Sequence, residues 1–71
     1  MSISYNRLWK LLIDSHMKKK DLKEKAALST ATLAKLGKNE SVSLDVLVRI
    51  CKVLNCEIGD VVEIVEDQNQ K

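Results

Sequence analysis

The stretch that decides the fold is KKDLKEKAALSTATLAKLGKN, residues 19–39. In its first half Leu22 and Ala26 lie four residues apart, the spacing that places two side chains on one face of a helix. Ser29 follows three residues later. Serine is a strong helix N-cap because its hydroxyl accepts a hydrogen bond from a free backbone N–H group. The pattern therefore predicts one short helix before Ser29 and a second that begins directly after it.

The second of these helices is short. Leu33 and Leu36 form its apolar side, and Gly37 or Asn39 is expected to end it. A helix of about nine residues does not persist alone in water, so neighbouring helices must hold it. Two helices joined by a three- or four-residue turn can pack at a steep angle, and the second can then lie in the major groove of DNA. The sequence therefore predicts a helix-turn-helix.

Helical periodicity continues on both sides of this stretch. Leucines at 8, 11 and 12 recur at helical spacing near the N-terminus, and Ser43 is a suitable cap for a strongly apolar helix that ends at Asn55. After Val62 the β-branched run leaves helix or extended chain open. An all-α fold is expected, with helices over residues 4–16, 19 or 20 to 27, 30 to 37–39 and 44–54, and a short final helix or turn within 58–65.

Length and composition limit the class of protein. Seventy-one residues make one domain, residues 1–71, with 66–71 expected to be a disordered tail. There is no proline and the aromatic content is 3%, which favours helices and weakens a single-strand or RNA-binding interpretation. The apolar runs are too short for a membrane span, there is no signal-peptide layout, and two cysteines are too few for a disulfide framework. A cytoplasmic protein is expected.

The net charge of +2 conceals an uneven distribution. Residues 17–38 contain seven lysines against Asp21 and Glu24, a net charge of +5, whereas residues 57–71 carry −4. A basic middle and an acidic end indicate one side that faces a polyanion and one that turns away from it, although two ordinary solvated faces would give the same pattern.

The helix-turn-helix geometry selects candidate DNA-binding residues. Outward residues on the second helix must be polar or small enough to approach base edges, and Lys35 is the main candidate for a base contact because lysine reaches guanine O6 and N7. Donors near helix N-termini suit phosphate groups. The candidates are Thr30, Ala31, Thr32 and Lys35 for the groove, Lys19, Lys20 and Ser29 for phosphates, and Lys38 and Asn39 for the flanking backbone.

These residues, together with SVSLDVLVRICKVLNCEIGDVVE (residues 41–63), resemble the Cro/C1-type (Xre-type) helix-turn-helix transcriptional regulators. The resemblance implies a five-helix, lambda-repressor-like fold and repression or activation at operators in double-stranded DNA, often as a homodimer. Two positions depart from the family pattern. Lys23 stands where a small residue is usual, so its stem must lie along the neighbouring helix. Ala27 stands where glycine is usual in the turn, which requires an unstrained φ.

Other classes of function have little support in the sequence. There is no nucleophile triad, phosphate loop or carboxylate pair, and two cysteines with a distant His16 do not complete a zinc site, so neither an enzyme nor a cofactor is expected. No small-molecule effector is expected, and double-stranded RNA is disfavoured by its narrow major groove. The remaining alternative is a protein-interaction module, such as an antitoxin or adaptor that kept the fold. The candidates for a dimer contact are Val61, Val62, Ile64 and Val65.

Overall fold

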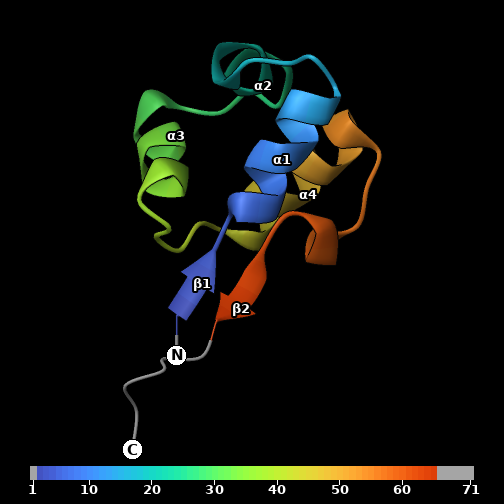
Figure 1. Cartoon of the computed structure of the whole chain (residues 1–71). Helices are drawn as coiled ribbons and strands as arrows, with labels where there is room; N and C mark the ends of the chain where they lie inside the picture. The colour runs from blue at the N-terminus through green and yellow to red at the C-terminus, as the bar shows by residue number, and fades with distance from the viewer. Residues whose placement is uncertain (1, 66–71) are drawn as a thin grey trace, which may run out of the picture.

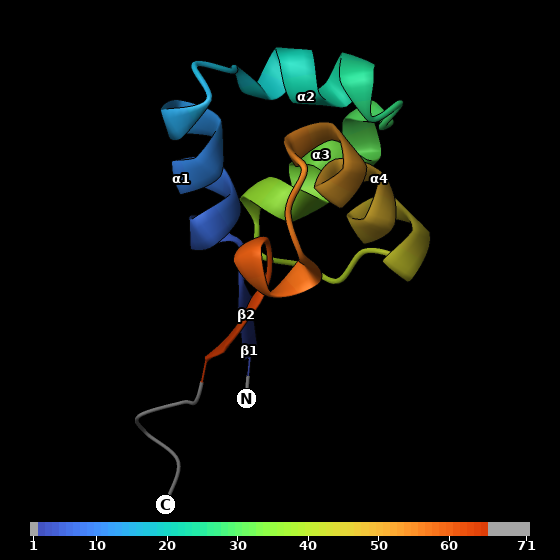
Figure 2. The same ribbon diagram turned by 90° about the vertical axis from the view of Figure 1, so that its right-hand side faces the viewer.

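Four α-helices and a small two-stranded sheet form the described part of the chain, residues 2–65, in this computed structural model (Figure 1). The elements in chain order are β1 (Ser2–Ser4), α1 (Asn6–Asp14), α2 (Lys19–Lys25), α3 (Thr30–Gly37), α4 (Leu44–Leu54), the 3₁₀ turn η1 (Ile58–Asp60) and β2 (Glu63–Val65). The helices make the body of the molecule, and the two strands project from one end of it (Figures 1 and 2). None of the helices in residues 2–65 has the length and apolarity to cross a membrane.

Every α-helix contributes to one core. The largest side chains that are almost fully buried are Tyr5, Leu8, Leu22, Leu36, Ile50 and Val61. Leu22 and Leu36 come from the two helices predicted around Ser29, and both are 0% exposed. Burial of apolar surface, rather than helix propensity, therefore holds the short helices in place.

The sheet corrects the expected all-α, five-helix fold. β1 and β2 pair antiparallel, with Ser2 opposite Val65, Ile3 opposite Ile64 and Ser4 opposite Glu63. The first helix accordingly begins at Asn6 and not at residue 4, and in place of a fifth α-helix there is only the single turn η1. The β-branched residues near the C-terminal end favour extended backbone, and the N-terminal strand supplies the hydrogen-bonding partner. The predicted tail, residues 66–71, lies outside the described residues.

All four helices are followed by a residue in the left-handed region, and none of these residues is glycine: they are His16, Ala27, Asn39 and Asn55. In each case the next N–H group donates to a carbonyl five residues back, for example Leu28 N to Lys23 O at 2.8 Å. This hydrogen bond is the mark of the Schellman motif. The expectation of an unstrained φ at Ala27 is wrong, because its φ is 55°.

The last of these helix ends brings two cysteines together. Cys56 N donates to Cys51 O at 3.0 Å, which places both residues at the positions whose side chains touch in a Schellman motif. Cys51 is buried and Cys56 half-buried, and both are free thiols. Two causes raise the pKa of Cys56 to about 11: burial of its thiol has the larger effect, and the neighbouring Cys51 adds to it.

Replacing Ala27 with glycine is expected to stabilise the protein by about 1 kcal/mol, because an L-residue in the left-handed region costs roughly 1–2 kcal/mol and glycine loses part of that gain through its unfolded-state entropy. Urea unfolding at constant m-value measures the change. Ala34→Gly, on an exposed turn of α3, is the matched control and should destabilise by about 1 kcal/mol. Destabilisation by both variants would contradict the strain at Ala27.

Cys56 is expected to react slowly with alkylating agents at pH 8, because a thiol of pKa about 11 is ionised in only ~0.1% of molecules. Iodoacetamide labelling followed by peptide mass analysis measures the rate, and the same chain unfolded in urea is the control. The rate for folded protein should still be rising between pH 9 and pH 10. A plateau below pH 9 would disprove the raised pKa.

Candidate nucleic-acid interface

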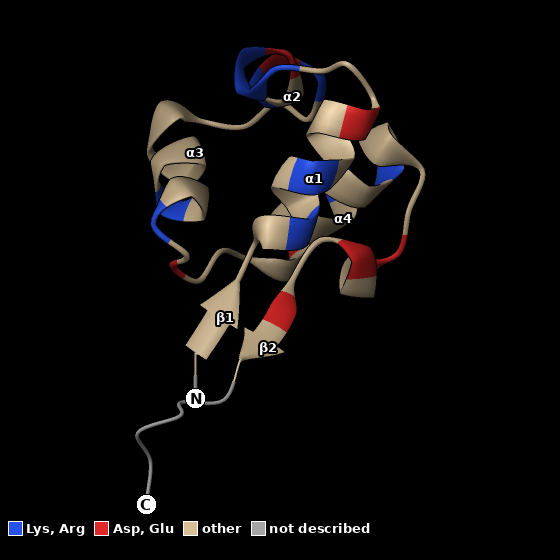
Figure 3. Ribbon diagram, viewed as in Figure 1, with Lys and Arg blue, Asp and Glu red and all other residues tan. Residues whose placement is uncertain are grey.

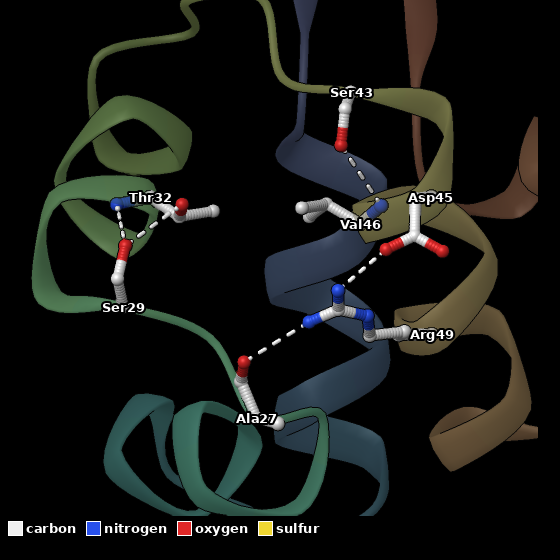
Figure 4. Close-up of polar contacts among 7 residues, drawn as sticks. All are labelled: Ala27, Ser29, Thr32, Ser43, Asp45, Val46 and Arg49. Atoms are coloured by element: carbon white, nitrogen blue, oxygen red, sulfur yellow. Dashed lines mark hydrogen bonds and ion pairs between the residues drawn. The ribbon is translucent and has the colours of Figure 1, made fainter.

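The helix-turn-helix consists of α2, the turn that follows it, and α3. Ser29 caps α3 as predicted: its Oγ accepts a hydrogen bond from Thr32 N at 3.0 Å (Figure 4). The Ser29 hydroxyl also donates to Thr32 Oγ1 at 3.0 Å. The start of α3 is therefore fixed locally, and its first backbone N–H groups point out of the helix end.

One side of α3 is exposed along its whole length. Leu36 is buried and Leu33 half-buried, so this helix turns its leucines to the core. The exposed residues follow helical spacing and form what we call the α3 face: Thr30, Ala31, Ala34, Lys35 and Lys38. Ala34 was not among the predicted site residues, although its place one turn after Ala31 could have identified it. Thr32 is half-buried and its hydroxyl is held by Ser29, so it lies at the edge of this face.

Lysines lie on α2, which precedes the α3 face, and at the C-terminal end of α3. In Figure 3 basic residues gather on α2 and at the end of α3, while acidic residues mark η1 and β2. Lys19 and Lys20 are exposed at the start of α2, and Lys19 Nζ lies 4.5 Å from the centroid of the Trp9 ring. This cation–π contact orients the Lys19 side chain and gives Trp9 a defined role on α1. The basic and acidic segments of the sequence therefore also lie in different parts of the structure.

Asn39 has a structural task in addition to its predicted place beside the interface. Its Oδ1 accepts a hydrogen bond from Tyr5 N at 3.1 Å, and Tyr5 Oη donates to Glu40 O at 2.7 Å. Tyr5 is 1% exposed, and burial raises its pKa. These contacts attach the C-terminal end of α3 to the start of α1. They join residues far apart in the sequence and left no local signal in it.

Arg49 fixes the other end of α3. Its Nη1 donates to the carbonyl of Ala27 at 3.1 Å, inside the turn, and its Nη2 bonds to Asp45 Oδ2 on the same helix (Figure 4). The carboxylate orients the guanidinium, and the guanidinium holds the turn against α4. Sequence reasoning missed this residue, and the only local trace of it is the four-residue spacing between Asp45 and Arg49.

The comparison with known families decides what this arrangement is. The sequence model of the Cro/C1-type HTH DNA-binding domain matches residues 7–67. The chain belongs to the Cro/C1-type helix-turn-helix DNA-binding domains. This is a DNA-binding class and not an enzyme class, and within residues 2–65 no cluster of three or more His, Cys, Asp or Glu could hold a metal ion.

A solved structure of the same type is closely similar to this Cro/C1-type domain. The crystal structure of transcriptional regulator VanUg, Form II, superposes with a TM-score of 0.90 at 56% sequence identity, and the match covers 93% of this chain and 88% of that one. Among curated protein sequences there is no significant match. The likeness therefore extends over most of the chain.

The two departures from the Cro/C1-type pattern are accommodated differently. Lys23 is half-buried, as expected for a stem that lies along its neighbours. Ala27 accepts the left-handed conformation itself, and Arg49 holds its carbonyl. A hydrogen bond from α4 therefore supports the turn of this Cro/C1-type domain at a position where the left-handed backbone would favour glycine.

Replacing Arg49 with lysine is expected to destabilise the domain by about 1 kcal/mol, because an ammonium group cannot hold the Ala27 carbonyl and the Asp45 carboxylate in one plane. Chemical denaturation measures the change. Lys52→Ala, an exposed cation on the same helix, is the control and should stay within about 0.5 kcal/mol of the parent. Equal stabilities of the Arg49→Lys variant and the parent would show that the contacts of Arg49 with Ala27 and Asp45 contribute nothing to stability.

Proposed function

We propose that the chain binds double-stranded DNA in a sequence-specific manner and regulates transcription as a repressor, with α3 in the major groove. The observation that carries the proposal is the α3 face, the exposed side of a capped helix in a Cro/C1-type domain, with lysines on α2 before it and at its C-terminal end. A closely similar structure is that of a transcriptional regulator, which supports the same role. Repression is the simplest outcome for so small a domain, because occupying a site is enough to block it.

Each part of the interface has a proposed task. Lys35, which is exposed on the α3 face, contacts a base. Thr30 and Ala31 approach the edges of neighbouring bases or thymine methyl groups. Thr32, at the edge of the α3 face, contacts the DNA at the side of the major groove. The phosphate contacts come from Lys19, Lys20, Ser29, Lys38 and Asn39.

The proposed reading surface is small, and this favours two copies on one site. Helix α3 has only eight residues, and only some of them are exposed on the α3 face. Each good base contact supplies about 1–3 kcal/mol of discrimination, so one copy distinguishes few base pairs. A homodimer on a two-fold operator would double the number of contacts.

Lys35→Ala and Lys20→Ala are expected to have different effects on DNA binding. Loss of Lys35 should relax the preference at one base position by about 1–3 kcal/mol, whereas loss of Lys20 should weaken all duplexes alike and lower the salt slope by about 1. Binding is measured by fluorescence anisotropy at several salt concentrations, on a duplex selected from a random pool and on a scrambled duplex.

Lys52→Ala removes an exposed lysine from α4, outside α2 and α3, and serves as the control; it should leave both affinities nearly unchanged. Equal, sequence-blind losses from Lys35→Ala and Lys20→Ala would remove the base-reading role proposed for Lys35. Absence of any duplex binding at low salt would reject the proposed function as a whole.

A second candidate is a protein-interaction module that kept the fold. It is favoured by a shallow hollow of about 260 Å³ near the end of α4, where Val48 and Ile58 are partly exposed. This hollow is lined by residues outside α2 and α3. A chain that retards no duplex at low salt but copurifies with a defined protein would favour this candidate.

A further inference from the structure

The two cysteines of the chain form a pair of adjacent thiols at the end of α4. Cys51 lies in the last turn of this helix, and Cys56 comes directly after the left-handed residue Asn55. The hydrogen bond from Cys56 N to Cys51 O, at 3.0 Å, folds the chain back so that the side chains at these two positions meet. The thiols are also hydrogen-bonded to each other. Packing alone does not require sulfur here, because the contact between these positions is ordinarily made by apolar side chains.

The thiol pair borders the shallow hollow near the end of α4. Both cysteines line this hollow, whose volume is about 260 Å³, together with Lys52, Asn55 and Ile58 among others. Cys51 is 9% exposed and Cys56 is half-buried. Small solutes can therefore reach the pair from one side, while the core closes it from the other.

Negative charges lie close to the thiol pair. Burial has the largest effect in raising the pKa of Cys56 to about 11, and Cys51, Asp60 and Glu57 add to it. The two carboxylates disfavour a free thiolate but favour a bound cation. Lys52, on the rim of the same hollow, is the positive charge beside them. The pair is thus expected to stay protonated until a cation that binds sulfur strongly displaces the protons.

The number and kind of ligands limit which cation fits the thiol pair. Structural zinc requires four ligands, as do iron–sulfur clusters, and within residues 2–65 no group of three or more His, Cys, Asp or Glu is suitably placed. Soft thiolates select Cu(I) among the remaining ions. The filled d shell of Cu(I) allows linear coordination by two ligands, so two adjacent sulfurs are sufficient for it.

We propose that Cys51 and Cys56 bind one cuprous ion, Cu(I), between their two sulfurs. Each thiol releases its proton to solvent as a Cu–S bond forms, and the ion stays Cu(I), so no electron is transferred. The bound ion would link the end of α4 to the segment that leads into η1. This segment lies on the opposite side of the molecule from α3 in Figure 1. The inference is therefore independent of the proposed DNA binding.

Competition with the coloured Cu(I) chelator bicinchoninate tests the proposal, on the full chain kept reduced and free of oxygen. The parent should withdraw one Cu(I) per chain from the chelate. Cys56→Ser and Cys51→Ala should each lower the affinity about a hundredfold or more, because a single thiolate remains. Since two protons leave, the affinity of the parent should rise about a hundredfold per pH unit below about pH 8.

Met17→Leu is the matched control, because it removes the remaining sulfur of residues 2–65 and leaves the thiol pair intact. This variant should bind Cu(I) as the parent does, and excess Zn(II) should not displace the ion. Circular dichroism checks that the variants remain folded, and Cys56→Ser tests the pair at its less buried member.

A parent that leaves the chelate intact, or a Cys56→Ser variant that binds like the parent, would overturn the inference. Binding of one ion per two chains would also overturn it, because the ligands would then come from different copies. So would displacement by Zn(II), which would require a larger set of ligands.

Discussion

Helices of seven to eleven residues cannot persist alone, and everything else in this structure depends on how they are held together. The answer is one core to which each helix sends at least one buried side chain: Leu8, Leu22, Leu36 and Ile50, with Tyr5 and Val61 closing it from the two ends of the chain. So small a core leaves no helix independent of the others. The exposed side of α3 is available for DNA because its other side is needed by the core.

Two residues, Arg49 and Tyr5, hold the ends of α3 through hydrogen bonds, in addition to its apolar packing. Arg49 holds the turn before the helix, through the carbonyl of Ala27, and Tyr5 holds the loop after it, through Asn39 and Glu40. Hydrogen bonds have direction, whereas hydrophobic burial does not. A helix held at both ends by directional contacts can present its exposed side chains without reorganisation, and this would lower the entropic cost of binding a partner.

The sequence was informative where the cause is local. The Ser29 and Ser43 caps and the buried face of α2 and α3 follow from residues close together in the chain, and the structure confirms them. The pairing of Ser2 with Val65 joins the two ends of the described chain, so no short window of sequence reveals it. The Arg49 contact spans 22 positions, and the strain at Ala27 depends on that distant support. Which residues touch DNA stays a prediction, because contact depends on a partner as well as on the fold.

The antiparallel pairing of β1 and β2 also has a topological consequence. Because Ser2 lies beside Val65, the described chain is nearly a ring, held closed by three residue pairs. A short covalent link between the strands would turn the pair into a continuous β-hairpin, and the chain could then be opened at an exposed connection elsewhere, since domains with adjacent ends tolerate circular permutation. The cyclic order of the elements thus defines the fold, and the fold does not depend on which connection between them is open.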